Sequence, residues 1–322
     1  MQENEISSSG QRIRGVLAPV VTPFKADLSP DSKRFIAHCN WLLSQNCGLA
    51  VFGTNSEANS MSAEERMTLL DALVAAGIDS SRMMPGTGCC SITETVELTK
   101  HAVKHGCAGV LMLPPFYYKN VSEEGLYRYF SEVVQRVGDA RLKIYLYHIP
   151  PVAIVGITPK LVQRLLNAYP TSIAGMKDSS GDWNNTKTFL DAFSGTAGAP
   201  RTFDVFVGSE SFLLANMRNG GVGTISATAN VNPALIHKLY SEWNSADDAE
   251  QQQTQLNVVR DVLNNKRLPS LIAALKQAIA IYGNDPEWSR VRPPLIELTT
   301  DQAKLLAADL KAIGFAMSGI SL

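Results

Sequence analysis

The sequence predicts an α/β fold, a (β/α)8 TIM barrel followed by a small C-terminal helical domain. Short apolar runs alternate with helical patterns at fairly even intervals up to residue 232, and no strand pattern follows. The apolar runs are continuous, as expected for parallel strands covered on both faces. Eight such runs, each but the last followed by a helical pattern, favour a barrel over a doubly wound sheet.

The predicted strands and helix starts divide the chain into three parts. The strands are expected at residues 15–24, 49–55, 83–88, 109–115, 143–150, 172–177, 205–210 and 222–228. Helix starts are indicated by Ser29-Pro30, by the capping box "SAEE" from Ser62 to Glu65, and by Thr158-Pro159. From Pro233 onward the pattern is amphipathic at helical spacing. We therefore expect a disordered leader (1–14), a catalytic barrel (15–232) and a helical bundle (233–322).

Composition narrows the classes of function. The 322 residues include 29 Lys plus Arg and 30 Asp plus Glu, so a net charge of -1 argues against a nucleic-acid partner. The N-terminus is polar, and the apolar runs end before the roughly 18 residues that a membrane span needs. The five cysteines fit neither a zinc site nor a disulfide framework. These features predict a cytoplasmic protein with reduced cysteines that acts on small molecules.

A single lysine ends the sixth predicted strand, in "SIAGMKDSSGD". Barrel chemistry lies at the carboxyl ends of the strands, which is where Lys177 stands. Desolvation by Ile173, Ala174 and Met176 would favour the neutral amine, which can condense with a ketone. The alternative is a surface lysine paired with Asp178, and position alone does not decide between them.

Two further features stand at the same end of the predicted barrel. Tyr147 closes the apolar strand "KIYLYHIP", where a phenol can pass protons to and from a reacting group. The turn "GTNSE" after the second strand offers backbone N–H groups and the Thr54 hydroxyl to a carboxylate. A buried structural tyrosine and an ordinary turn before a helix remain as the alternatives.

Together these motifs resemble the pyruvate-dependent class I aldolases of the dihydrodipicolinate synthase and N-acetylneuraminate lyase family. "GTNSE", "YHIP", "GMKDSSGD" and "GTISATANV" carry the resemblance, which runs from about Gly15 to Leu295. The resemblance implies that Lys177 forms an imine with a 2-oxo acid and that Tyr147 transfers protons. It implies that Thr54 and Asn55 bind the substrate carboxylate and take part in the proton transfer. It also implies that Tyr118 enters a neighbouring subunit's active site in a homotetramer. The substrate-binding residues it implies are Gly53, Asn55, Ser179, Gly208, Glu210 and Ile225.

Departures from the family pattern bear on the substrate. The lysine-pathway synthase has an arginine where this chain has Val152, and valine cannot make a bidentate carboxylate contact. Asn55 and "MKDSSGD" are similar to the 4-hydroxy-2-oxoglutarate aldolase branch. Ser179 and Glu210 match positions that contact substrate hydroxyls in lyase members, with a solvated helix cap as the alternative for Glu210. His148 replaces the family's asparagine, and a structural imidazole bonded to backbone is favoured over a second base.

These observations predict a Schiff-base lyase that cleaves or forms a hydroxylated 2-oxo acid, with pyruvate as the enamine partner. They argue against a true dihydrodipicolinate synthase. No metal or organic cofactor is expected, because the imine is the electron sink. The alternatives are a 2-oxo-3-deoxy sugar acid dehydratase and a 2-oxo acid sensor without turnover. The expected ligands are therefore pyruvate, or another 2-oxo acid, and an aldehyde.

Overall fold

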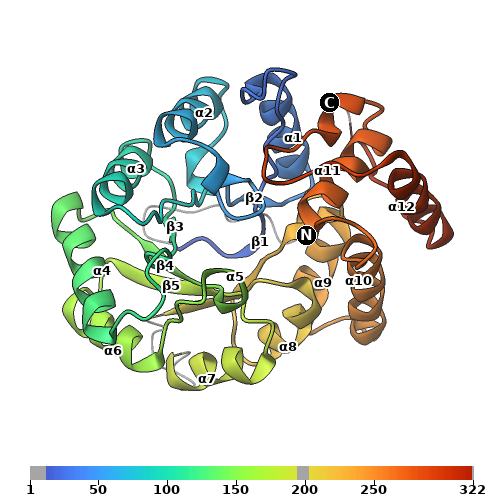
Figure 1. The fold of residues 1–322 in the computed structure, drawn as a ribbon. Coiled ribbons are helices and arrows are strands. Elements are labelled where there is room, and N and C mark those ends of the chain that lie inside the picture. Colours follow the sequence, from blue (N-terminus) through green and yellow to red (C-terminus); the bar gives the residue numbers. More distant parts are fainter. Residues whose placement is uncertain (1–11, 194–202, 321–322) are drawn as a thin grey trace.

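The computed structural model describes residues 12–193 and 203–320, and in it parallel strands form a ring that helices surround (Figure 1). Most of the predicted leader, residues 1–11, lies outside the described residues. Within the described part of the chain, no helix is both long and apolar enough to cross a membrane.

Seven strands make one sheet, and every paired strand runs parallel to its neighbour. The order across the sheet is β2-β1-β7-β6-β5-β4-β3. The strands are β1 Gly15–Ala18, β2 Gly48–Leu49, β3 Val110–Met112, β4 Ile144–His148, β5 Ile173–Asp178, β6 Asp204–Val207 and β7 Gly223–Ile225. Each overlaps or adjoins a predicted strand, and most are shorter than predicted.

The segment Met83–Gly86 joins the two edges of this sheet and closes the ring. Its first residue bridges Leu49 of β2, and its last bridges Leu111 of β3, both in the parallel sense. We call this segment the barrel seam. The predicted strand 83–88 is thus reduced to isolated bridges, because Pro85 has no N–H to donate to a regular ladder. With the seam included, the arrangement is consistent with the predicted barrel.

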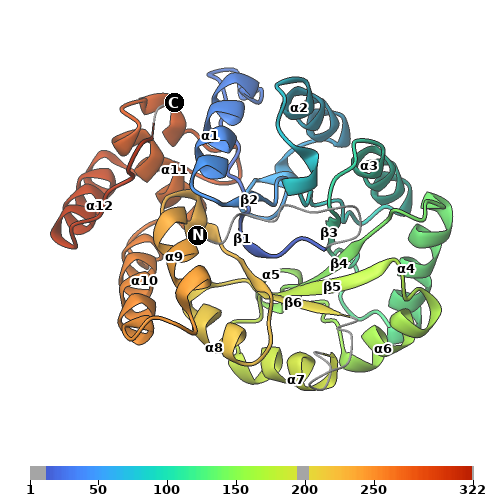
Figure 2. The same cartoon turned by 180° about the vertical axis from the view of Figure 1, so that it is seen from behind.

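The helices form an outer layer around the strands (Figure 2). The α-helices are α1 Ser32–Ser44, α2 Ala63–Ala75, α3 Ile92–Lys104, α4 Glu123–Val137, α5 Pro150–Ala153, α6 Pro159–Ala168, α7 Trp183–Phe193, α8 Leu213–Arg218, α9 Pro233–Glu242, α10 Ala249–Leu263, α11 Leu271–Tyr282 and α12 Thr300–Ala312. Short 3₁₀ helices lie at Ala58–Ser60, Ser80–Arg82, Glu210–Phe212, Ala227–Asn230 and Pro286–Ser289. Helix α9 packs against β1, whereas α12 packs against α10 and α11 beside the ring.

Two of the three predicted helix starts are confirmed. Ser62 caps α2 in a capping box with Glu65, and Thr158 caps α6 with a proline next to it. The start at Ser29-Pro30 is wrong, because Asp31 caps α1 by accepting a hydrogen bond from the Arg34 N–H at 3.1 Å. Ser29 instead hydrogen-bonds the carboxylate of Asp27 in the preceding turn.

Buried apolar side chains divide into an outer cluster between sheet and helices and an inner cluster within the ring. The ring interior is therefore a packed core, as in other (β/α)8 barrels. The inner cluster contains Leu17, Ala50, Met84, Leu111, Tyr145, Tyr147, Ala174, Phe206, Val222 and Ile225. All five cysteines are free; Cys39 and Cys47 are buried and Cys90 is exposed.

Candidate active site

Lys177 lies on β5, and the residue is 2% exposed. Its neighbours in the sheet are Tyr147 of β4 and Phe206 of β6, both members of the inner cluster. Asp178 points the other way, toward α7, where its Oδ2 accepts a hydrogen bond from Thr186 Oγ1 at 2.6 Å. The alternative of a surface lysine paired with Asp178 is therefore wrong.

The apolar surroundings of the lysine differ from those expected. Met176 belongs to the outer cluster, because successive residues of a strand face opposite sides of the sheet. Ile173 belongs to it as well, because the pairing of β4 with β5 shifts by one residue between Ile173 and Gly175. Ala174 alone of the three expected neighbours belongs to the inner cluster. Aromatic rings lie on the adjacent strands instead, and Lys177 Nζ is 4.4 Å from the centroid of the Tyr147 ring.

Three side chains form a hydrogen-bonded chain at the carboxyl ends of the strands. Lys177 Nζ donates to Tyr147 Oη at 3.3 Å, and Tyr147 Oη lies 3.3 Å from Thr54 Oγ1. We call Lys177, Tyr147 and Thr54 the relay. Its members come from β5, from β4 and from the turn after β2, so the fold brings together residues far apart in sequence. A buried amine beside a phenol is suited to imine formation, since the phenol can carry protons to and from the reacting atoms.

The turn "GTNSE" is held by its own hydrogen bonds. The Gly53 N–H donates to Ser56 Oγ at 3.2 Å, and the Glu57 N–H donates to Thr54 O at 3.2 Å. Among the described residues, the N–H groups of Thr54 and Asn55 make no hydrogen bond. Both residues are partly exposed, so this turn offers two backbone donors beside the relay.

Glu57 anchors that turn to the C-terminal helices. Its Oε1 accepts a hydrogen bond from Lys276 Nζ at 2.7 Å, and both side chains are fully buried. Its Oε2 accepts a hydrogen bond from the Arg292 N–H at 2.7 Å. Burial lowers the pKa of Lys276 to about 8, while the Glu57 carboxylate opposes that shift. This pair was not predicted, although the lone lysine in the apolar helix "LIAALKQAIAIY" was a readable signal.

His148 ends β4 and Ser179 follows β5, and the Ser179 N–H donates to His148 O at 2.7 Å. The Ile157 N–H donates to His148 Nδ1 at 2.9 Å, which confirms an imidazole bonded to backbone. Burial lowers the pKa of His148, and the Asp178 carboxylate opposes the shift. Ser179 lies against Gly208, where a Cβ would come within 1.9 Å of the serine Oγ. Glycine is thus required at 208 for the ends of β5 and β6 to approach.

Glu210 is buried in a polar network in the segment after β6. Its Oε1 accepts a hydrogen bond from Thr228 Oγ1 at 2.5 Å, while its Oε2 accepts hydrogen bonds from Ser226 Oγ and, at 3.1 Å, from Arg260 Nη1. The residue is 1% exposed, so the alternative of a solvated helix cap is wrong. Both oxygens already have protein partners, which differs from the expectation that they read the hydroxyls of a substrate. Ile225, also expected to bind substrate, is a buried member of the inner cluster.

Tyr118 lies on the loop after β3 and is 74% exposed. Its ring packs edge-on against that of Tyr117 at 5.3 Å between centroids. Within the described chain, no hydrogen bond joins it to the relay. The predicted role of Tyr118 concerns a neighbouring subunit and stays a prediction.

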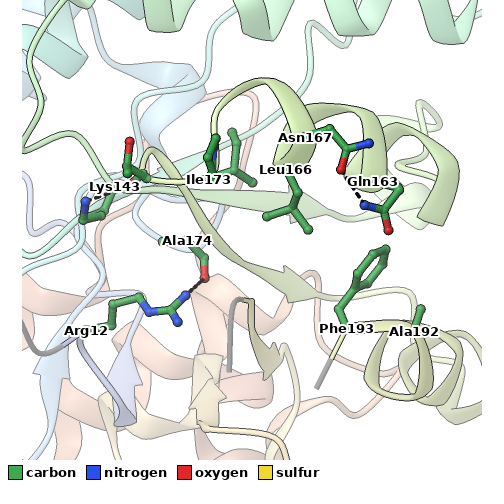
Figure 3. A pocket seen from close by; sticks show the side chains of 11 residues that line it. Arg12, Lys143, Gln163, Leu166, Asn167, Ile173, Ala174, Ala192 and Phe193 are labelled. Carbon is green, nitrogen blue, oxygen red and sulfur yellow. Dashed lines mark hydrogen bonds between the residues drawn. The ribbon is translucent and has the colours of Figure 1, made fainter. Parts of the chain in front are cut away.

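A cavity of about 570 Å³ lies at the opposite end of the ring (Figure 3). Ile173 and Ala174, at the start of β5, line it together with Lys143 and Arg12, whose guanidinium donates to Ala174 O at 2.7 Å. This end of a (β/α)8 barrel serves stability, whereas catalytic groups stand at the carboxyl ends of the strands. The cavity is therefore separate from the relay.

The chain is similar to known proteins over most of its length. The chain matches the Dihydrodipicolinate synthetase family over residues 12–313. It is 31% identical to an uncharacterized DapA-like lyase of Chloroflexus aurantiacus over 93% of this chain and 97% of that protein. Among solved structures, it is similar to dihydrodipicolinate synthase from Agrobacterium tumefaciens, with 30% identity, a TM-score of 0.82, and 94% and 99% of the two chains covered.

A second solved structure is YagE, a prophage protein of the dihydrodipicolinic acid synthase family from E. coli K12, in complex with pyruvate. The identity is 27% and the TM-score 0.83, over 94% of this chain and 99% of that one. Members of the family are lyases, and the match covers the strands, the relay and the helices α9 to α12. The chain belongs to the dihydrodipicolinate synthetase family.

Proposed function

We propose that this protein is a Schiff-base lyase, an aldolase that cleaves or forms a hydroxylated 2-oxo acid with pyruvate as the enamine partner. The observation that carries the proposal is the buried Lys177 amine, hydrogen-bonded at 3.3 Å to a phenol that lies 3.3 Å from Thr54 Oγ1. The complex of YagE with pyruvate supports the choice of 2-oxo acid. The imine supplies the electron sink, so no metal or organic cofactor enters this proposal.

In the cleavage direction, the neutral Lys177 amine attacks C2 of the 2-oxo acid, and the carbinolamine loses water to give a protonated imine. Tyr147 carries the protons that these steps move, passing them through Thr54. Removal of the C4 hydroxyl proton then breaks the C3–C4 bond, whose electron pair enters the imine to form an enamine. The aldehyde leaves, C3 of the enamine takes up a proton, and water releases pyruvate from the lysine.

The "GTNSE" turn is the proposed carboxylate site. The free N–H groups of Thr54 and Asn55 and the hydroxyl of Thr54 can bind the C1 carboxylate beside the amine. Such contacts would hold C2 of the substrate close to Lys177 Nζ, and fixed orientation contributes strongly to catalysis. The ion pair between Glu57 and Lys276 supports this role, because it fixes the turn to helix α11.

We further propose a homotetramer built from dimers, in which Tyr118 completes the neighbouring active site. Four exposed apolar residues in the segments after β3 and β4 support this surface: Tyr117, Tyr118, Val152 and Ile154, each at least 61% exposed. Exposed apolar patches of this kind mark interaction sites. In this assembly residues 15–232 form the catalytic barrel, and residues 233–322 form the helical bundle.

Val152 supports a substrate other than that of the lysine-pathway synthase. It lies on α5, directly after β4, and the residue is 61% exposed. An arginine there would offer a bidentate contact to a second carboxylate, which an isopropyl group cannot make. We therefore propose that residue 152 does not bind a carboxylate group of the aldehyde partner.

Borohydride trapping tests the central proposal. Incubation of the protein with pyruvate and borohydride is expected to give a covalent adduct on Lys177, because reduction fixes the imine. Lys177→Ala is expected to abolish the adduct, whereas Lys143→Ala, at the opposite end of the ring, is expected to keep it. An adduct of unchanged yield in Lys177→Ala, measured by mass spectrometry, would refute the assignment. If the unmodified protein binds pyruvate but forms no adduct, the alternative of a 2-oxo acid sensor without turnover would be favoured.

A panel of hydroxylated 2-oxo acids tests the reaction class and the substrate. Release of free pyruvate is expected from at least one of them, since cleavage yields pyruvate and dehydration does not. Condensation of pyruvate with aspartate semialdehyde, the synthase reaction, is expected to be at least tenfold slower than the best cleavage. Val152→Arg is expected to narrow that difference by supplying the missing carboxylate contact. A loss of substrate without pyruvate release would instead identify a dehydratase.

A further inference from the structure

Outside the active site, two histidines and an aspartate converge on the outer surface of the ring. His101 and His105 are four residues apart at the C-terminal end of α3, and Asp71 lies on the neighbouring helix α2. Both imidazoles approach one carboxylate oxygen, since Asp71 Oδ1 lies 2.8 Å from His101 Nε2 and 2.6 Å from His105 Nε2. Figure 1 shows the two helices side by side.

We propose that these three residues bind a divalent transition-metal ion, Zn²⁺ in the first instance, which ties α2 to α3. Imidazole nitrogen and carboxylate oxygen are ligands that zinc prefers, and a histidine pair at i and i+4 faces one side of a helix. The three ligand atoms lie within 4.8 Å of one another. Ligands about 2.1 Å from a tetrahedral Zn²⁺ are roughly 3.4 Å apart, so small side-chain rotations would seat the ion.

The hydrogen bonding of the cluster also favours an ion. His101 Nε2 is buried and makes no hydrogen bond within the described chain, although it lies 2.8 Å from the carboxylate oxygen. The contact with the carboxylate thus lacks hydrogen-bond geometry, and a metal ion held by both groups would satisfy the buried nitrogen. The side chain of Asp71 is 54% exposed, which leaves the site open to solvent for a water ligand.

The position of the cluster gives the ion a structural role. In a barrel the helices run opposite to the strands, so the C-terminal end of α3 lies at the amino ends of the strands. The relay lies at the other end, and the zinc proposal is therefore independent of the proposed lyase activity. A bound ion would fix the distance between two neighbouring helices of the outer layer.

The test is a titration of the full-length chain with Zn²⁺ in competition with a chromophoric chelator. Any affinity tag is removed, and Cys90→Ser is used as the background because that thiol is exposed. One Zn²⁺ per chain is expected. The double variant His101→Gln with His105→Gln is expected to lose this binding. Asp71→Asn is expected to weaken it at least tenfold, since even indirect partners of a metal contribute about 10- to 100-fold.

His237→Gln provides the matched control, because this histidine lies on α9, away from the cluster. It is expected to bind Zn²⁺ as the background does. Equal affinity in the double variant, or no binding by the background chain, would overturn the proposal. Those results would leave the three residues as a hydrogen-bonded contact between helices.

Thermal unfolding tests the link between α2 and α3. At a free Zn²⁺ concentration one hundred times Kd, the midpoint is expected to rise by roughly 4 °C, since the ion binds the folded chain. The double variant is expected to show no rise. A rise of equal size in the double variant would contradict the assignment of the site, and specific binding without any rise would contradict the structural role.

Discussion

Tyr147→Phe is expected to lower kcat by about 10²- to 10⁴-fold, because it removes the hydroxyl that joins Lys177 to Thr54. The phenyl ring still fills its place in the inner cluster, so the fold is expected to survive. Lys177 keeps its amine, and borohydride trapping with pyruvate is expected to continue at a reduced rate. Steady-state and single-turnover kinetics measure the two effects separately.

Tyr145→Phe is the matched control for this prediction. Tyr145 lies two residues earlier on the same strand, belongs to the same inner cluster, and its hydroxyl makes no hydrogen bond within the described residues. Its kcat is expected to equal that of the unmodified protein. Equal losses in both variants would show that the effect of Tyr147→Phe arises from packing and not from proton transfer.

Lys276→Met is expected to lower the free energy of unfolding by about 3–5 kcal/mol, because it leaves the Glu57 carboxylate buried without its counter-ion. The double variant with Glu57→Gln is expected to recover most of this loss, since neither charge then remains. Lys304→Met, at an exposed position on α12, is expected to change stability by less than about 0.5 kcal/mol. Urea unfolding at one protein concentration measures all three.

The same pair predicts a pH dependence. The pKa of Lys276 is about 8 in the folded state, below its ordinary value of 10.5, and burial is the main cause. Between these values the unfolded chain binds more protons than the folded one, so stability from this group rises with pH. The burial penalty is fully present below pH 8 and is lifted toward pH 10.5. The difference in stability between the unmodified protein and Lys276→Met is expected to grow over this window; a constant difference would contradict the shifted pKa.

The local parts of the fold could be predicted because their causes are local. Continuous apolar runs marked the strands, and the capping box at Ser62 marked the start of α2. The start of α1 was placed two residues too early, because serine and aspartate are both favoured N-caps and the actual cap, Asp31, follows Ser29 closely. The third strand had the right position, but only isolated bridges mark it, because Pro85 has no N–H to donate to a regular ladder.

The relay residues could be predicted from their positions at strand ends, whereas the contacts behind them could not. Glu57 and Lys276 are 219 residues apart, and a sequence pattern does not show which helix returns to which turn. Glu210 was expected at the substrate, but its contact with Arg260 depends on how α10 packs against the ring, and its contact with Thr228 depends on the 3₁₀ helix after β7. The roles of Glu57, Lys276 and Glu210 therefore depend on long-range packing, which the local sequence pattern does not show.

The barrel seam has a consequence for the precision of the active site. Thr54 follows β2 and Tyr147 lies on β4, so the shorter path around the ring between them crosses the seam and β3. At Gly86 a single methyl group would come within 2.2 Å of Phe52 O and would force the seam apart. The width of the seam therefore helps to set the distance between the hydroxyl groups of Thr54 and Tyr147. A misplacement of about 1 Å can cost 100-fold in rate, so this width bears directly on catalysis.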